Sequence, residues 1–135
     1  MFRRGGEHER GQALVEFAMV MPIMLLLLFA LVDFGRAFYS WLLITNAARE
    51  GARVAATQSP LTDVETRIYE AASVLDAASI TITTTNVQGN RGETVEIDLA
   101  FSFSFVTPIG NLAGLLGGTT VSAPTITGHS SMRLE

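Results

Sequence analysis

Hydrophobic residues dominate the first third of the chain. Residues 17–32 contain no charged side chain, and the segment from Gln12 to Val32 is 21 residues long. As a helix this segment would measure roughly 31 Å, which matches the ~30 Å hydrocarbon core of a bilayer. The helical pattern then continues to about Thr57, with a kink expected at Pro22. The pattern therefore predicts one long helix whose first part can span a membrane.

Small side chains recur at helical spacing in the second part of this predicted helix. They form a strip of Ala47, Ala48, Gly51, Ala52, Ala55 and Ala56. Small residues at this spacing allow another backbone to approach closely. Two interpretations stay open: the strip contacts another helix, or it packs against the chain's own domain.

The sequence after Ser59-Pro60 predicts a second helix. Thr62 reads as an N-cap with Glu65 three residues later, a capping box that opens a helix to about Ala78. Its apolar residues lie on one face, so we expect it to be amphipathic and to lie on a sheet.

A period of two replaces the helical period from Ser79 onward. It predicts strands at 80–85, at 95–105 and between Thr119 and Arg133, with a turn at 88–92. The apolar stripe of the central strand comprises Val95, Ile97, Leu99, Phe101, Phe103 and Phe105. The fold class is therefore α+β, with a long N-terminal helix and a small head of one amphipathic helix and a short antiparallel sheet. Residues 108–118 read as a Leu- and Gly-rich loop that either packs under the sheet or contacts a partner or a membrane surface.

Charged residues at the ends of the apolar run are the candidate functional groups. Glu16 stands at its beginning, where a carboxylate needs a partner, and a cut between Gly11 and Gln12 would free an amino group close to it. Asp33 and Arg36 stand at its other end, three residues apart, and are expected to pair with each other or with neighbouring subunits.

Composition excludes several classes of function. The net charge is −4, so the chain has no electrostatic footprint for nucleic acid, and Cys is absent, which excludes disulfides and thiolate metal sites. His, Asp and Glu show no metal-ligand spacing, and Asp33-Phe34-Gly35 lacks the other motifs of a kinase. We therefore expect no enzyme activity, no cofactor and no small-molecule substrate.

These residues together resemble the TadE-like family of pilus-assembly proteins. The resemblance covers residues 11–18 with Pro22, residues 33–36, residues 46–53, the Leu/Gly loop and residues 132–135. It implies a prepilin-like subunit, a minor pilin or pseudopilin, of a tight-adherence (Flp-type) pilus. A prepilin peptidase would cut after Gly11, and Glu16 would pair with the free amino terminus of a subunit. The implied partners are the membrane, that peptidase and other pilin-like subunits.

The corresponding organisation has four parts. They are a leader at 1–11, a transmembrane helix at 12–33, a helix extension at 34–58 and an extracytoplasmic head at 59–135. Arg3, Arg4 and Arg10 favour a cytoplasmic N-terminus, so the head would lie outside a single-pass inner-membrane anchor and, after assembly, in the extracellular pilus. Two alternatives remain: a membrane-anchored interaction module that forms no filament, and a secreted domain that begins near Arg36 after loss of a signal peptide.

Overall fold

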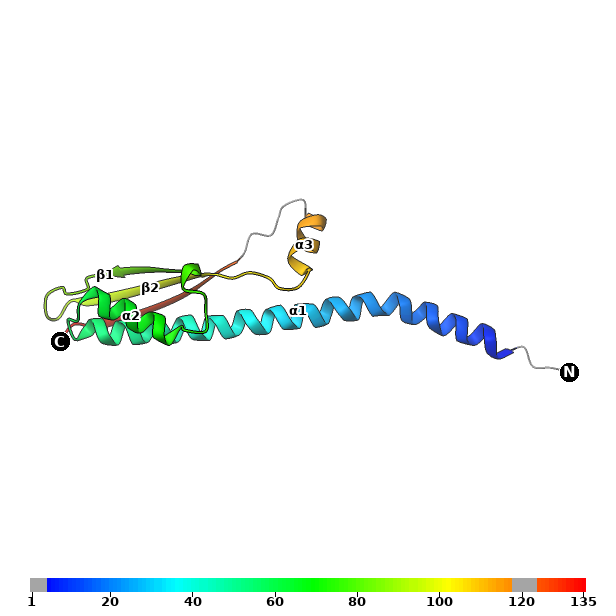
Figure 1. Ribbon diagram of the computed structural model, residues 1–135, viewed down its shortest axis with the longest axis horizontal. Coiled ribbons are helices and arrows are strands. Elements are labelled where there is room, and N and C mark those ends of the chain that lie inside the picture. The colour runs from blue at the N-terminus through cyan, green and yellow to red at the C-terminus, as the bar shows by residue number, and fades with distance from the viewer. Residues whose placement is uncertain (1–4, 118–123) are drawn as a thin grey trace.

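The computed structural model of the protein describes residues 5–117 and 124–135. Its dominant element is α1, Gly5–Ala56, a helix of 52 residues that extends far beyond the rest of the molecule (Figure 1). The axis of α1 bends in its blue N-terminal part, which contains Pro22, a residue without the N–H that a helical hydrogen bond needs. The predicted long helix is confirmed. Residues 1–4 of the predicted leader lie outside the described residues.

The second helix, α2, spans Leu61–Ala71 and differs from its prediction at both ends. Its N-cap is Pro60, whose carbonyl accepts hydrogen bonds from the backbone N–H groups of Asp63 and Val64 at 3.0 and 3.2 Å. Thr62 therefore lies in the first turn, and the predicted capping box is wrong. The helix also ends before Ala78, because Asp76 caps a separate 3-10 turn, η1, at Ala77–Ser79 by accepting from the N–H of Ala78.

Three strands form one antiparallel sheet in the order β1-β2-β3. They are β1 at Ile80–Thr85, β2 at Thr94–Ser102 and β3 at Thr125–Arg133. The register places Ile80 opposite Phe101 and Leu99 opposite Gly128. The predicted sheet is confirmed, but its central strand ends at Ser102 and not at Phe105, since the ladder to β3 ends with Ser102 opposite Thr125. Residues 119–123 of the predicted last strand lie outside the described residues.

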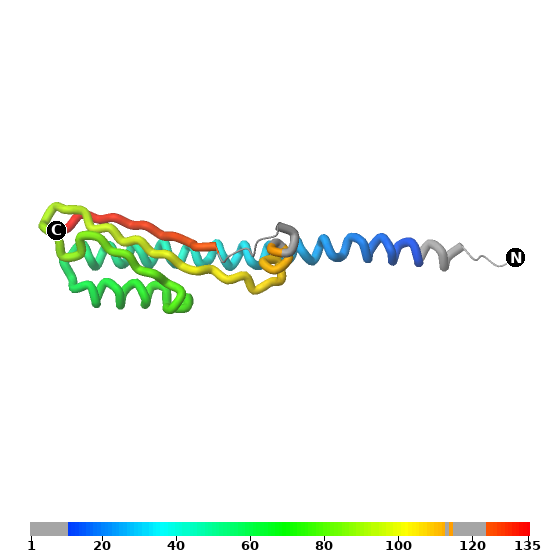
Figure 2. Tube along the Cα trace, turned by 90° about the horizontal axis from the view of Figure 1, so that it is seen from above, coloured from blue at the N-terminus to red at the C-terminus, as the bar shows by residue number. Residues whose placement is uncertain are grey.

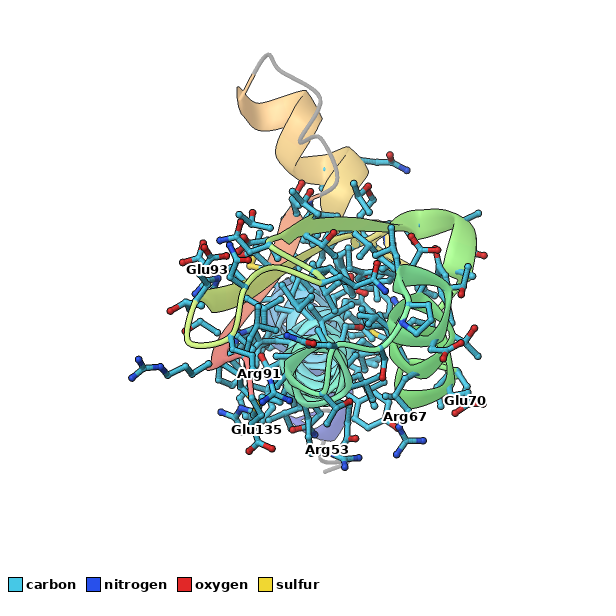
Figure 3. All side chains as sticks on the ribbon, turned by 90° about the vertical axis from the view of Figure 1, so that its left-hand side faces the viewer. Arg53, Arg67, Glu70, Arg91, Glu93 and Glu135 are labelled. Atoms are coloured by element: carbon cyan, nitrogen blue, oxygen red, sulfur yellow. The ribbon has the colours of Figure 1, made fainter. Side chains whose placement is uncertain are left out.

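Helices α1 and α2 lie side by side and cover one face of the sheet (Figures 2 and 3). The inward side chains of β2 are buried against them, as the period of two predicts. Helix α2 thus lies on the sheet as expected, in one core with β2, and it packs closely on α1 as well. Gly51 permits this, because a Cβ at that position would lie 2.6 Å from Cγ1 of Ile68 on α2.

The segment predicted as a Leu- and Gly-rich loop contains a helix, α3, at Ile109–Gly117. At the start of this helix the N–H of Leu112 donates a hydrogen bond to the carbonyl of Pro108, four residues earlier, at 2.9 Å. Helix α3 stands beyond the end of the sheet, above the middle of α1 (Figure 1). The interpretation of this segment as core under the sheet is therefore wrong. Gly118 lies outside the described residues.

Candidate assembly site along the long helix

The proposed processing residues lie on the free part of α1. Gln12 and Glu16 are one helical turn apart, and the side-chain amide Nε2 of Gln12 donates a hydrogen bond to Oε1 of Glu16 at 3.2 Å. Both side chains are exposed. A Cβ at Gly11 would meet nothing within 4 Å among the described residues, so a larger side chain there would not disturb the packing. The geometry leaves Glu16 with a neutral partner and an open surface around it.

The helix that follows carries an apolar surface that the described part of the head does not cover. Its large hydrophobic side chains are exposed from Leu14 to Val32, with Leu27 at 66%, except that Phe29 is half-buried. In water an apolar surface this extensive is unfavourable and marks a membrane or partner contact. One helix of the described chain is long and apolar enough to cross a membrane, which is compatible with single-pass anchoring.

Asp33 is the first charged residue after this apolar run and is buried, with 3% of its surface exposed. The backbone N–H of Val106 donates to its Oδ1 at 3.2 Å, and the hydroxyl of Thr107 donates to its Oδ2. The guanidinium of Arg36 lies 3.6 Å from Oδ1. Asp33 therefore fastens the segment after β2 to α1, and we call this group of four residues the Asp33 clamp.

Arg36 connects the Asp33 clamp to the core of the head. Its Nη1 donates to the carbonyl of Ser104 at 3.3 Å, and its guanidinium lies 5.3 Å from the ring centroid of Phe103. The sequence suggested a partner for Asp33 only at Arg36 or on another subunit. Val106 and Thr107 were missed because they are more than 70 residues away and carry no motif.

The strip of small residues lies under the chain's own head. Ala47, Ala48, Ala52 and Ala55 are fully buried, and Gly51 is buried as well. The sheet crosses α1 closely at one point, where a Cβ on Gly128 would lie 3.0 Å from the backbone of Ile44. In the described structure the strip thus brings the sheet and α2 to α1.

Charged side chains form ion pairs between α1 and α2 at the exposed rim of the helix pair. Arg53 and Arg67 both contact Oε2 of Glu50, at 2.7 and 3.4 Å, and Arg67 also reaches Glu70 at 3.2 Å. The hydrogen bond from Arg53 lowers the pKa of Glu50 below its usual value, assisted by the charge of Arg67. Figure 3 shows Arg53, Arg67 and Glu70 pointing away from the core, so this cluster adds little stability.

No group of three or more His, Asp and Glu side chains within the described ranges could hold a metal ion. On the exposed face of the sheet, Asp98 and His129 lie opposite each other, with 2.8 Å between Oδ1 and Nδ1. They form an ordinary cross-strand pair.

Comparison with protein families matches residues 11–53 to the family described as TadE-like protein. The matched segment begins at Gly11 and contains Glu16, Asp33 and most of the small-residue strip. The resemblance that the residues suggest is confirmed for this part of the chain. Searches of curated proteins and of solved structures found no match.

Proposed function

With the TadE-like match over residues 11–53 as premise, we propose that this chain is a prepilin-like subunit, a minor pilin or pseudopilin, of a Tad/Flp-type pilus. It is trimmed after Gly11 and enters a filament through the apolar part of α1. The observation that carries the proposal is Glu16, an exposed carboxylate at the beginning of an exposed apolar helix, one turn after Gln12.

Trimming would change the partner of Glu16 from a neutral amide to a charged amine. Side chains at positions i and i+4 of a helix lie about 5–6 Å apart, and the α-amino group of a chain that begins at Gln12 belongs to the same turn. An unpaired carboxylate in an apolar surrounding is costly, whereas a hydrogen-bonded ion pair is tolerated. Glu16 would therefore pair with a free amino terminus, either its own or that of a neighbouring subunit, and a pair with the neighbour would set the register between subunits.

The proposed organisation has four parts, of which the first three lie wholly or mostly on α1. Residues 1–11 are the leader, 12–33 the membrane and filament helix, 34–58 the extension that carries the head, and 59–135 the extracytoplasmic head. The N-terminus lies in the cytoplasm, where the prepilin peptidase acts, and the head lies across the inner membrane. The role is structural, and the partners are other pilin-like subunits.

The test is the variant Glu16→Ala. It removes the carboxylate and keeps a good helix former, so the chain should still insert into the membrane and be trimmed, yet enter filaments poorly. The fraction of the chain recovered with sheared filaments, relative to the membrane fraction, measures this. Leu14→Ala is the matched control, because Leu14 is an exposed residue of the same turn and its variant keeps the carboxylate.

Normal incorporation of Glu16→Ala would show that the carboxylate is merely interfacial and would contradict the role proposed for Glu16. Absence of the unmodified chain from filaments would instead favour a membrane-anchored module that forms no filament. A defect shared by Leu14→Ala would show that the apolar surface, and not the carboxylate, controls assembly.

A further inference from the structure

Five exposed apolar side chains of α1 follow a heptad spacing. They recur in steps of four, three, four and three residues and belong to Leu27, Leu31, Phe34, Phe38 and Trp41. Their exposed fractions, in the same order, are 66%, 67%, 69%, 51% and 45%. Alternating steps of three and four place side chains in one line along a helix, and a second helix packs along such a line in a coiled coil. We call these five residues the heptad stripe.

The head approaches α1 on a different side of the helix. The buried side chains at this level belong to Asp33, Ser40 and Ile44. Because successive residues turn by about 100°, the face that these three share lies about 120° around the helix from the heptad stripe. The described part of the head therefore leaves the stripe uncovered.

The Asp33 clamp places the last part of the heptad stripe outside the lipid. Val106 and Thr107 belong to irregular backbone between β2 and α3, and such backbone is not tolerated in contact with lipid hydrocarbon. The hydrocarbon core must therefore end at or before Asp33. Along the helix axis Trp41 lies roughly 12 Å beyond Asp33, whereas the headgroup layer is only about 5–8 Å thick on each side. Lipid can cover Leu31, but it cannot cover Trp41.

The heptad stripe is large enough to form a specific interface. From the exposed fractions of its residues, it presents roughly 500 Å² of apolar surface on each helix. Two such stripes would bury roughly 1,000 Å² together, which is the area at which specific interfaces begin. An apolar patch of this size that continues into water marks a contact with another protein.

A second copy of the chain presents a matching stripe. In the proposed topology all copies have the same orientation, and the Asp33 clamp gives them the same depth. Two copies therefore lie parallel, with identical residues at the same level, as a two-fold axis along the membrane normal requires. The heptad positions that flank the stripe, at 28, 30, 35, 37, 42 and 44, carry no charged side chain in the sequence. Like charges, which would keep identical copies apart, are thus absent from the contact.

We propose that the heptad stripe is the contact between two copies of this chain, which pair through parallel α1 helices in the membrane before assembly. The inference rests on the membrane anchoring in the proposed function and is independent of trimming. In the pair, Phe34, Phe38 and Trp41 of one copy lie against the same residues of the other, so that water no longer reaches their rings.

Single cysteine substitutions test the contact, because the chain contains no Cys of its own. A disulfide needs two Cα atoms within about 7 Å, a distance that a residue of the pair reaches only where it faces its own counterpart. The full chain with Phe38→Cys is reconstituted in phosphatidylcholine vesicles at a low ratio of protein to lipid and oxidised with copper phenanthroline. It should form a disulfide-linked dimer on a non-reducing gel.

Tyr39→Cys is the matched control. Tyr39 is exposed at 51%, as Phe38 is, but lies about 120° around the helix from the heptad stripe. It should give several-fold less dimer than Phe38→Cys. If Tyr39→Cys links as much as Phe38→Cys, the copies meet by random collision, and the inference is overturned.

Two further positions of the stripe separate the remaining outcomes. Leu31→Cys tests the part within the lipid and Trp41→Cys the part beyond it, and both should link as Phe38→Cys does. Linking of Leu31→Cys alone would show that the copies touch only within the lipid, which overturns the inference. If no variant links although the chain stays with the vesicles through an alkaline wash, the anchoring holds and the pair does not exist. If the wash releases the chain, the membrane anchoring is wrong and the inference falls with it.

Discussion

Phe103 shows how a single side chain links the core of the head to the stalk. It is 2% exposed, its ring meets Phe105 edge-on with 5.7 Å between centroids, and the guanidinium of Arg36 lies over its face. Edge-to-face aromatic pairs and cation–π contacts add to the stabilisation from burial. Period-two alternation predicts the inward direction of Phe103, whereas the sequence does not indicate that Arg36 lies above it.

Replacing Phe103 with Ala should lower the free energy of unfolding of the head by about 3–5 kcal/mol, because it leaves a cavity in the core. Ser102→Ala is the matched control on the neighbouring exposed position and should change it by less than about 0.5 kcal/mol. Denaturant titrations of the detergent-solubilised chain, followed by the circular dichroism of the sheet, measure both. An equal, small effect of the two variants would show that the aromatic stripe is not the core of the head.

Asp33 marks the limit of residue-level prediction. Its place at the end of an apolar run and its spacing to Arg36 indicate an ion pair, and the two groups do lie 3.6 Å apart. Its hydrogen bonds to Val106 and Thr107 depend on the path of the chain after β2. Local spacing carries no information about that path, so the part of the clamp that matters most for the fold was not predicted.

At the scale of elements, α1 changes its surroundings along its length. Its first half presents large apolar side chains to the outside, and its second half presents small ones to the sheet and to α2. The small strip was predictable as a contact surface because its spacing is helical. The sequence did not decide between another helix and the chain's own domain as the contact. Both can approach closely only where the side chains are short.

Element boundaries were predicted less well than element types. The start of α2 was misplaced because the carbonyl of Pro60 takes the capping role that Thr62 was expected to play. Helix α3 was missed because its Gly residues at 110, 114 and 117 lower helix propensity, and only its place beside Phe105 and α1 supports it.

The crossing of β3 over α1 depends on Gly128. A Cβ there would lie 2.8 Å from Cγ2 of Ile44 and 3.0 Å from its backbone, which cannot move aside within a helix. Gly128→Ala should therefore lower the free energy of unfolding by about 1–3 kcal/mol, the usual cost of overpacking. The denaturant titration used for Phe103 checks it, with Thr127→Ala on the exposed face of β3 as control. A neutral Gly128→Ala variant would mean that β3 and α1 are farther apart than described.

At the scale of the whole molecule, the two ends of α1 differ in their contacts: one packs in the head and the other does not. The C-terminal end of α1 is tied to the head, because the carbonyl of Ala56 accepts from the N–H of Glu135 at 3.1 Å and the neighbouring Leu134 is buried. The N-terminal part extends alone, as Figure 1 shows. The apolar surface that the described chain leaves open therefore lies along the N-terminal part of α1 and along the exposed side of residues 34–42. An apolar surface of this extent marks a membrane or partner contact.

The central claim is that this extended part is trimmed before it enters a filament. A matched pair of variants isolates the cut, since a Cβ at Gly11 or at Gly35 meets nothing within 4 Å among the described residues. Gly11→Leu should block trimming by altering the residue that the peptidase reads. Gly35→Leu adds the same side chain to the same helix and should be trimmed normally.

The most direct measurement is the mass and N-terminal sequence of the protein recovered from sheared filaments. The account predicts a chain that begins at Gln12 and lacks residues 1–11. A filament-borne chain that still begins with Met1, or one that begins near Arg36 after loss of the apolar segment, would contradict it.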